Sequence, residues 1–142
     1  MKKEKLVILL IRLAMGFVFM WAFFDKVFGL GFATSAKNAW INGVSPTYGF
    51  LKMATRGPFV EIFHNLAGLA IVDWLFMLGL LFVGLTLIFN KFIKWGCITG
   101  IIMMTLIYLA SLFPVNNPIV DEHIIYILVL WLITIKRSDY NS

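Results

Sequence analysis

Charged residues are scarce in this chain: Lys, Arg, Asp and Glu make up 13% of its 142 residues, whereas hydrophobic residues make up 61%. A soluble domain of this size needs a charged surface of about 25–35%. The missing charge therefore excludes an ordinary water-soluble fold. Since the length suits one domain, spanning 1–142, the composition indicates a single domain that is surrounded by lipid.

Cysteine and histidine are also nearly absent. The lone Cys97 excludes an intrachain disulfide, a CxxC redox pair and a four-thiolate cluster. His64 and His123 are the only histidines and show no metal-binding spacing, so we expect neither a metal nor a haem. The 12 basic residues outnumber the 7 acidic ones, but they are scattered beside apolar runs. We therefore expect no nucleic-acid partner and interpret the basic residues as topology signals.

Four apolar runs are each long enough to cross a hydrocarbon core of about 30 Å. They predict transmembrane helices over about 6–30, 70–89, 93–113 and 119–135. Asn117 and Pro118 are well placed as the N-cap and first residue of the last helix. The sequence thus predicts an all-α integral membrane protein, built as a four-helix transmembrane bundle.

The basic residues are unevenly distributed around these four spans. One side carries seven of them: Lys2, Lys3, Lys5, Lys91, Lys94, Lys136 and Arg137. The other side carries three, all in one long loop: Lys37, Lys52 and Arg56. Because segments rich in Lys and Arg stay in the cytoplasm, we predict a multi-pass protein of the cell membrane with both termini cytoplasmic.

The loop over about 31–69 is too long to be unstructured in so small a protein. Between Pro58 and Gly68, apolar residues recur at helical spacing, at Phe59, Ile62, Phe63 and Leu66. This pattern predicts a short helix lying in the membrane interface. The loop should therefore be extracytoplasmic and partly helical.

Ionisable residues gather near the extracytoplasmic ends of the predicted helices. They are Asp25, Lys26, Asp73, Asp121, Glu122 and His123. A charge at bilayer depth costs about 2.5–3.5 kcal/mol on insertion scales, so we predict that these residues form one polar site. Simple placement at helix N-termini, where the macrodipole favours acids, remains an alternative for the acids of the later helices. Asp25 ends a helix instead and needs a cation or a loop partner.

The first predicted helix also carries a stripe on one face. Steps of four and three residues connect Arg12, Gly16, Phe19, Phe23 and Lys26. One interpretation is that Arg12 snorkels to the inner interface. The other is that the stripe faces the bundle interior and lines a site for an amphipathic, partly aromatic molecule.

Several short motifs make the sequence similar to the DoxX family of small membrane proteins. They are Trp40-Ile41-Asn42-Gly43, Ser45-Pro46-Thr47, Gly49-Phe50-Leu51, Val72-Asp73-Trp74-Leu75, Asn117-Pro118 and Asp121-Glu122-His123, together with Arg12, Gly16, Phe19 and Lys26 of the first helix. The resemblance covers nearly the whole chain and implies a four-helix core. The best-known relatives are membrane subunits of thiosulfate:quinone oxidoreductase, so it also implies an oxidoreductase subunit that uses a quinone.

Within that implied role, Lys26 and His123 would donate hydrogen bonds to a quinone carbonyl. Asp25, Asp73, Asp121 or Glu122 would handle protons, and Arg12, Gly16, Phe19 and Phe23 would contact the quinone. The chain has no redox cofactor motif of its own, so electron transfer would need a partner subunit or a quinone acting directly. Two alternatives stay open: a scaffold that recruits a soluble redox enzyme, and a small lipid-binding or transport protein. A four-helix chain is small for transport unless it forms homo-oligomers.

Overall fold

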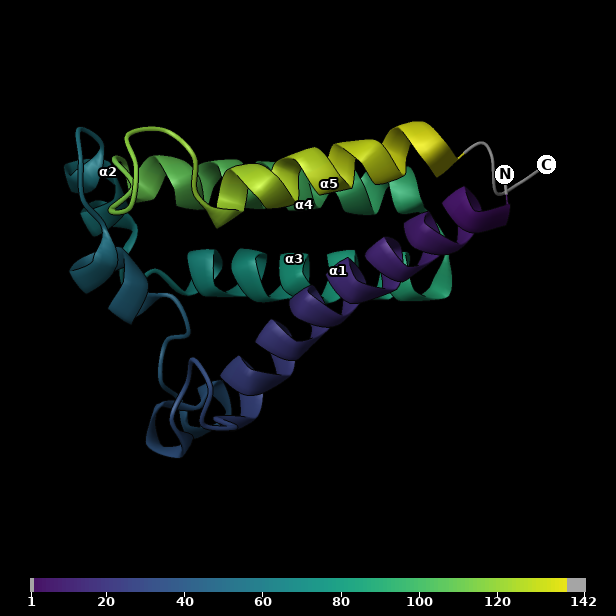
Figure 1. Cartoon of the computed structure of the whole chain (residues 1–142). Coiled ribbons are helices and arrows are strands. Elements are labelled where there is room, and N and C mark those ends of the chain that lie inside the picture. Colours follow the sequence, from purple (N-terminus) through teal and green to yellow (C-terminus); the bar gives the residue numbers. More distant parts are fainter. Residues whose placement is uncertain (1, 138–142) are drawn as a thin grey trace.

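The computed structural model describes residues 2–137, and every element in that range is helical (Figure 1). The long helices are α1 (Lys2–Phe28), α3 (Ala70–Phe89), α4 (Ile93–Ala110) and α5 (Glu122–Lys136). By length and composition, α1, α3 and α4 can each cross a membrane. The 15 residues of α5 rise about 22 Å, less than the thickness of a typical hydrocarbon core.

The long helices pack side by side in a defined order. α1 lies against α3, α3 against α4, and α4 against α5, and α5 also touches α1. Each helix contributes to one hydrophobic core, through Phe19 of α1, Met77 of α3, Cys97 of α4 and Leu130 of α5. The predicted all-α class is confirmed for the described residues.

Glycines allow these helices to approach closely. A Cβ added to Gly16 of α1 would lie 2.8 Å from Cγ1 of Ile88 in α3. A Cβ on Gly96 of α4 would overlap the hydroxyl of Thr86 in α3. Small residues at helix interfaces are typical of membrane proteins, in which close packing replaces the hydrophobic effect as the force between helices.

Large apolar side chains cover the outer faces of the long helices. Exposed examples are Leu10, Phe17, Leu75, Trp95, Leu106 and Trp131. A soluble monomer rarely exposes an apolar patch of more than a few hundred Å². The apolar helices and their exposed faces are consistent with a lipid bilayer as the surrounding medium.

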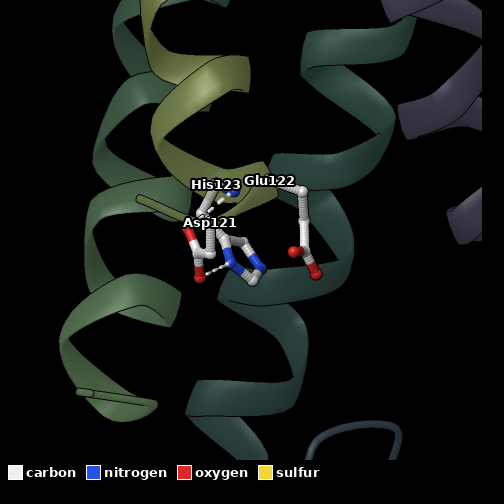
Figure 2. A group of neighbouring side chains, drawn as sticks. All are labelled: Asp121, Glu122 and His123. Carbon is white, nitrogen blue, oxygen red and sulfur yellow. Dashed lines mark hydrogen bonds and ion pairs between the residues drawn. The ribbon is translucent and has the colours of Figure 1, made fainter. Parts of the chain in front are cut away.

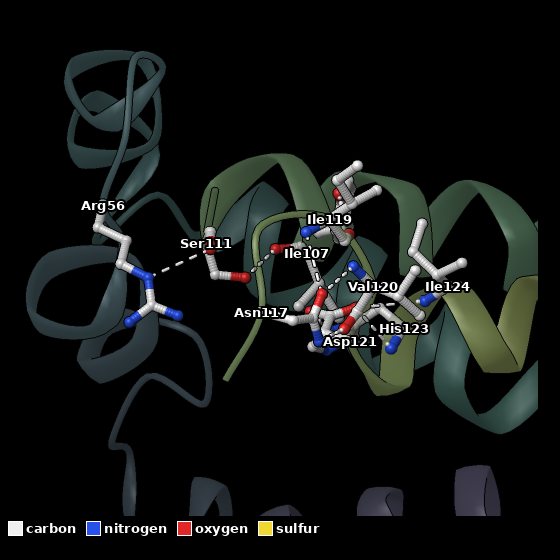
Figure 3. A network of polar contacts seen from close by, with 10 residues as sticks. Arg56, Ile107, Ser111, Asn117, Ile119, Val120, Asp121, His123 and Ile124 are labelled. Atoms are coloured by element: carbon white, nitrogen blue, oxygen red, sulfur yellow. Dashed lines mark hydrogen bonds and ion pairs between the residues drawn. The ribbon is translucent and has the colours of Figure 1, made fainter. Parts of the chain in front are cut away.

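The predicted boundaries of the last helix are wrong at its start. Asn117 does not cap it, because its side chain accepts hydrogen bonds from the amides of Ile119 and Val120 and closes a separate turn (Figure 3). Asp121 is the N-cap, and α5 begins at Glu122. Other boundaries shift by a similar amount: α1 runs from Lys2 to Phe28 instead of over 6–30, and α4 ends at Ala110 instead of 113, while α3 matches the predicted 70–89.

Four short helices structure the segment between α1 and α3. They are η1 (Ala36–Asn38), η2 (Trp40–Asn42), η3 (Phe50–Ala54) and α2 (Val60–Leu66). The segment lies at the end of the long helices that is opposite the start of α1 and the end of α5 (Figure 1). The predicted short helix is confirmed as α2, although Phe63 and Leu66 pack inward while Phe59 and Ile62 are exposed.

Candidate functional site

The ionisable residues of the predicted polar site lie at one end of the molecule, because α1 and α4 end there and α3 and α5 begin there (Figure 1). Asp25 and Lys26 belong to the last turn of α1, and Asp73 belongs to the first turn of α3. Residues 121–123 start α5. We call this the loop end of the molecule, since the segment 29–69 covers it.

Asp25 is almost completely buried, with 1% of its surface exposed. Its carboxylate accepts hydrogen bonds from three consecutive backbone amides, those of Phe32 at 3.2 Å, Ala33 at 2.8 Å and Thr34 at 2.9 Å. A buried carboxylate without such donors would be strongly unfavourable. The sequence left a cation or a loop residue as the partner of Asp25, and in the structure the partner is the loop.

Asp73 binds the far side of the same loop. Its Oδ1 accepts hydrogen bonds from Ser45 Oγ at 2.7 Å and from Thr47 Oγ1 at 2.5 Å. Ser45 Oγ in turn accepts the amide of Tyr48 at 3.1 Å. These hydroxyls belong to the Ser45-Pro46-Thr47 motif, so Asp73 ties this motif to the start of α3.

Asp121, Glu122 and His123 form a third group (Figure 2). Asp121 accepts hydrogen bonds from the amides of His123 and Ile124 and from the His123 ring, whose Nδ1 lies 2.8 Å from Oδ2. Burial is the largest influence and raises the pKa of Asp121, which precedes α5. The hydrogen bonds from His123 and Ile124 and the charge of His123 together outweigh it, so the pKa lies below 3.8.

One potential ligand atom from each member of this third group lies within 4.8 Å of the others. The three residues are consecutive in the chain, and both oxygens of Asp121 already accept hydrogen bonds. Glu122 is exposed. The cluster is explained by helix capping, and the expectation that the protein binds no metal stays a prediction.

The predicted single polar site is divided into three hydrogen-bonded groups. Within residues 2–137, no hydrogen bond or ion pair connects Asp25, Asp73 or Asp121 to another of these three acids. Two of them serve to hold the loop, and the third caps α5. Their roles in proton transfer stay predictions.

Lys26 has a different environment from the acids. Its side chain is partly buried, and its Nζ lies 5.9 Å from the ring centroid of Phe76 in α3. No side chain or carbonyl among the described residues accepts a hydrogen bond from Nζ, and the carboxylate of the neighbouring Asp25 bonds to backbone amides. The three N–H groups of Lys26 are thus available to a ligand at the loop end.

The helix 1 stripe faces inward, as one of the two interpretations predicts. Arg12, Gly16 and Phe19 are buried, and Phe23 and Lys26 are partly buried. The snorkelling interpretation of Arg12 is therefore wrong.

Helix packing occupies most of this stripe. Arg12 Nη1 donates a hydrogen bond of 2.5 Å to the carbonyl of Leu87. That carbonyl is among the last four of α3, where helical partners are missing and a cation is favoured. Phe19 is 2% exposed and enclosed by the core. Only the outer part of the stripe, Phe23 and Lys26, remains partly open.

Sequence reasoning assigned Arg56 only to topology and missed its structural role. Its amide donates to the carbonyl of Ala110 at 2.9 Å, and its Nε donates to the carbonyl of Ser111 at 3.2 Å (Figure 3). A Cβ on the following Gly57 would overlap the carbonyl of Leu112. The loop is thereby attached to the C-terminus of α4, and no local sequence signal indicates this contact.

Comparison of the chain with protein-family models, curated proteins and solved structures found no match. Over residues 2–137, the fold is that of an all-helical protein with three helices that are long and apolar enough to cross a membrane.

Proposed function

We propose that the chain is a DoxX family protein of the cell membrane with four spans, the fourth being α5. Its packing along α4 and against α1 supports this arrangement. The ends of α5 and α1 are joined by an ion pair, with Lys136 Nζ 2.6 Å from Glu4 Oε1. A helix shorter than the hydrocarbon core is accommodated by local thinning of the bilayer at a modest cost.

The termini are cytoplasmic in this proposal, and the loop end is extracytoplasmic. Four spans put all seven basic flanking residues at one end, in three places: the start of α1, the α3–α4 connection and the end of α5. The positive-inside rule assigns that end to the cytoplasm.

The chain acts as the membrane subunit of a quinone-linked redox complex and binds a quinone headgroup at Lys26. The observation that carries this proposal is the partly buried Lys26 ammonium, which has no hydrogen-bond acceptor among the described residues and lies beside the Phe76 ring. A quinone needs a donor for its carbonyl and apolar surroundings for its ring. Lys26 provides the donor, and Phe23 and Phe76 provide apolar rings.

The acid that handles protons in this proposal is Glu122, since the Nδ1 of His123 is already hydrogen-bonded to Asp121. Asp25 and Asp73 hold the loop, and Asp121 caps α5, so these three carboxylates are already occupied by structural hydrogen bonds. Quinone reduction takes up two electrons and two protons. The electrons come from a redox partner subunit, and the thiosulfate-oxidising complexes are the model for such a partner.

Replacement of Lys26 by Met tests the proposal. Loss of a charge-assisted hydrogen bond should weaken quinone binding by about 1.5–3 kcal/mol, which is roughly 10- to 150-fold in Kd. The fold should persist because Asp25 keeps its three amide donors. Lys37→Met, at an exposed loop lysine, is the matched control. Equal affinity of the Lys26→Met variant, or no saturable binding by the parent, contradicts the proposal.

A non-catalytic scaffold that recruits a soluble redox enzyme is the second candidate. It is favoured by the order of the loop, which is tied down by Asp25, Asp73 and Arg56. A double change of Ser45→Ala and Thr47→Val should then abolish recruitment of the enzyme. Under this alternative the unmodified protein binds no quinone. Mass spectrometry of lipids extracted with the purified protein distinguishes the quinone-binding subunit and the scaffold from a lipid carrier, because a lipid carrier would retain a phospholipid.

A further inference from the structure

The connections at the loop end expose many large apolar side chains. In the segments 29–69 and 111–121, Met53 is 85% exposed, Val115 77% and Phe32 74%. Ile41, Ile62, Phe113 and Ile119 are also exposed in these segments. A surface of this composition is unusual for loops that face water.

We propose that these connections lie in the lipid interface at the loop end, with their exposed apolar side chains entering the boundary between headgroups and acyl chains. This surface has the protein's own bilayer as its partner. The proposal is independent of quinone binding.

The level of the connections along α4 supports this placement. Arg56 bonds to the carbonyls of Ala110 and Ser111, at the last turn of a helix of 18 residues and about 27 Å. The Tyr108 hydroxyl, one turn earlier, donates to the carbonyl of Ile119. Both connections are therefore held at the end of a membrane-spanning helix, where the hydrocarbon core gives way to headgroups.

The short helices η3 and α2 are apolar on two sides. Leu51 and Phe63 pack inward on Ala110, and the two helices contact each other. Met53 and Ile62 of the same helices are exposed. A helix with one apolar face satisfies that face against the protein, whereas a second apolar side needs an apolar neighbour of its own. Lipid supplies that neighbour.

Charge in this part of the loop also suits a bilayer surface. Lys52 and Arg56 are exposed near the apolar side chains, and Glu61 is the single acid between 48 and 69. Basic residues beside exposed apolar groups are the usual composition of segments that bind anionic lipid surfaces. A second copy of the chain would bring the same positive charges against these residues, and so fits less well than lipid.

Fluorescence quenching in vesicles tests the placement. Met53→Cys and Val115→Cys are made in a Cys97→Ala background, since Cys97 is the one other thiol and is buried. Each is labelled with an environment-sensitive dye in vesicles of phosphatidylcholine and phosphatidylglycerol. Glu61→Cys, a polar position on α2 next to the exposed Ile62, is the matched control.

We expect spin labels on the upper acyl chain to quench the dyes at 53 and 115 several-fold more strongly than they quench the dye at 61. Aqueous iodide should show the opposite order. Equal access of iodide to all three positions overturns the proposal, because the connections then face water. Protection that disappears on dilution of the protein in lipid also overturns it, because a second copy then covers the surface. Thermal melting in mild detergent checks that each variant is folded.

Discussion

Replacement of Asp25 by Asn changes one atom of the most buried acid. Asp25 Oδ2 accepts the amides of Ala33 and Thr34, and Oδ1 accepts the amide of Phe32. The Asn carbonyl can keep the first two bonds, but its amide nitrogen then faces the N–H of Phe32. One charge-assisted bond is lost, and the other two lose the benefit of the charge. We expect a local cost of about 2–4 kcal/mol.

Hydrogen exchange in mild detergent measures this cost directly. A cost of about 2–4 kcal/mol accelerates exchange of the amides at 32–34 by roughly 30- to 900-fold. Asp73→Asn is the control, because it should loosen Ser45 and Thr47 and leave the amides at 32–34 protected. Unchanged exchange at 32–34 in folded Asp25→Asn protein would refute the anchoring role. The carboxylate would then be available for proton transfer.

Three further changes test other parts of the structure. Gly96→Ala should lower thermal stability in detergent by about 1–3 kcal/mol through overpacking. Gly49→Ala, where nothing lies within 4 Å of the added Cβ, should be nearly neutral. Equal effects of the two changes would contradict the close helix contact. Arg12→Met should cost about 1.5–3 kcal/mol because a carbonyl at the end of α3 loses its donor, and an unchanged melting temperature would argue against this cap. Reporter fusions should place Lys91 inside and Lys52 outside, and termini on opposite faces would require an odd number of spans.

The loop contacts change how the ionisable residues at the loop end are interpreted. Each acid could satisfy its charge in several ways, and the predicted common site was one of them. In the structure, Asp25 and Asp73 instead bind two parts of one loop, at 32–34 and at 45–47. Lys26, which is partly buried, and Glu122, which is exposed, are the ionisable groups that these contacts do not occupy. The candidate site therefore contains fewer residues than the predicted cluster.

The sequence by itself determined the all-helical class and the positions of the long helices. Hydropathy is a local property, so the length of an apolar run translates directly into a helix, and α3 was predicted to the residue. The helix α2 followed in the same way from apolar spacing. The start of α5 was predicted wrongly because Asn117 and Asp121 are both plausible caps, and local sequence does not decide which of them meets the free helix amides.

Only the tertiary structure decided which groups satisfy the buried charges. Asp73 and Thr47 are 26 residues apart, and Arg12 and the carbonyl of Leu87 are 75 apart. A buried charge needs a partner, but the sequence alone does not show which residue that partner is. The choice depends on how the helices pack and where the loop returns to them. For that reason the stripe on α1 was recognisable from residue spacing, but the sequence did not decide whether it faces inward. Nor did it show that the stripe packs against α3 and that Arg12 caps the end of α3.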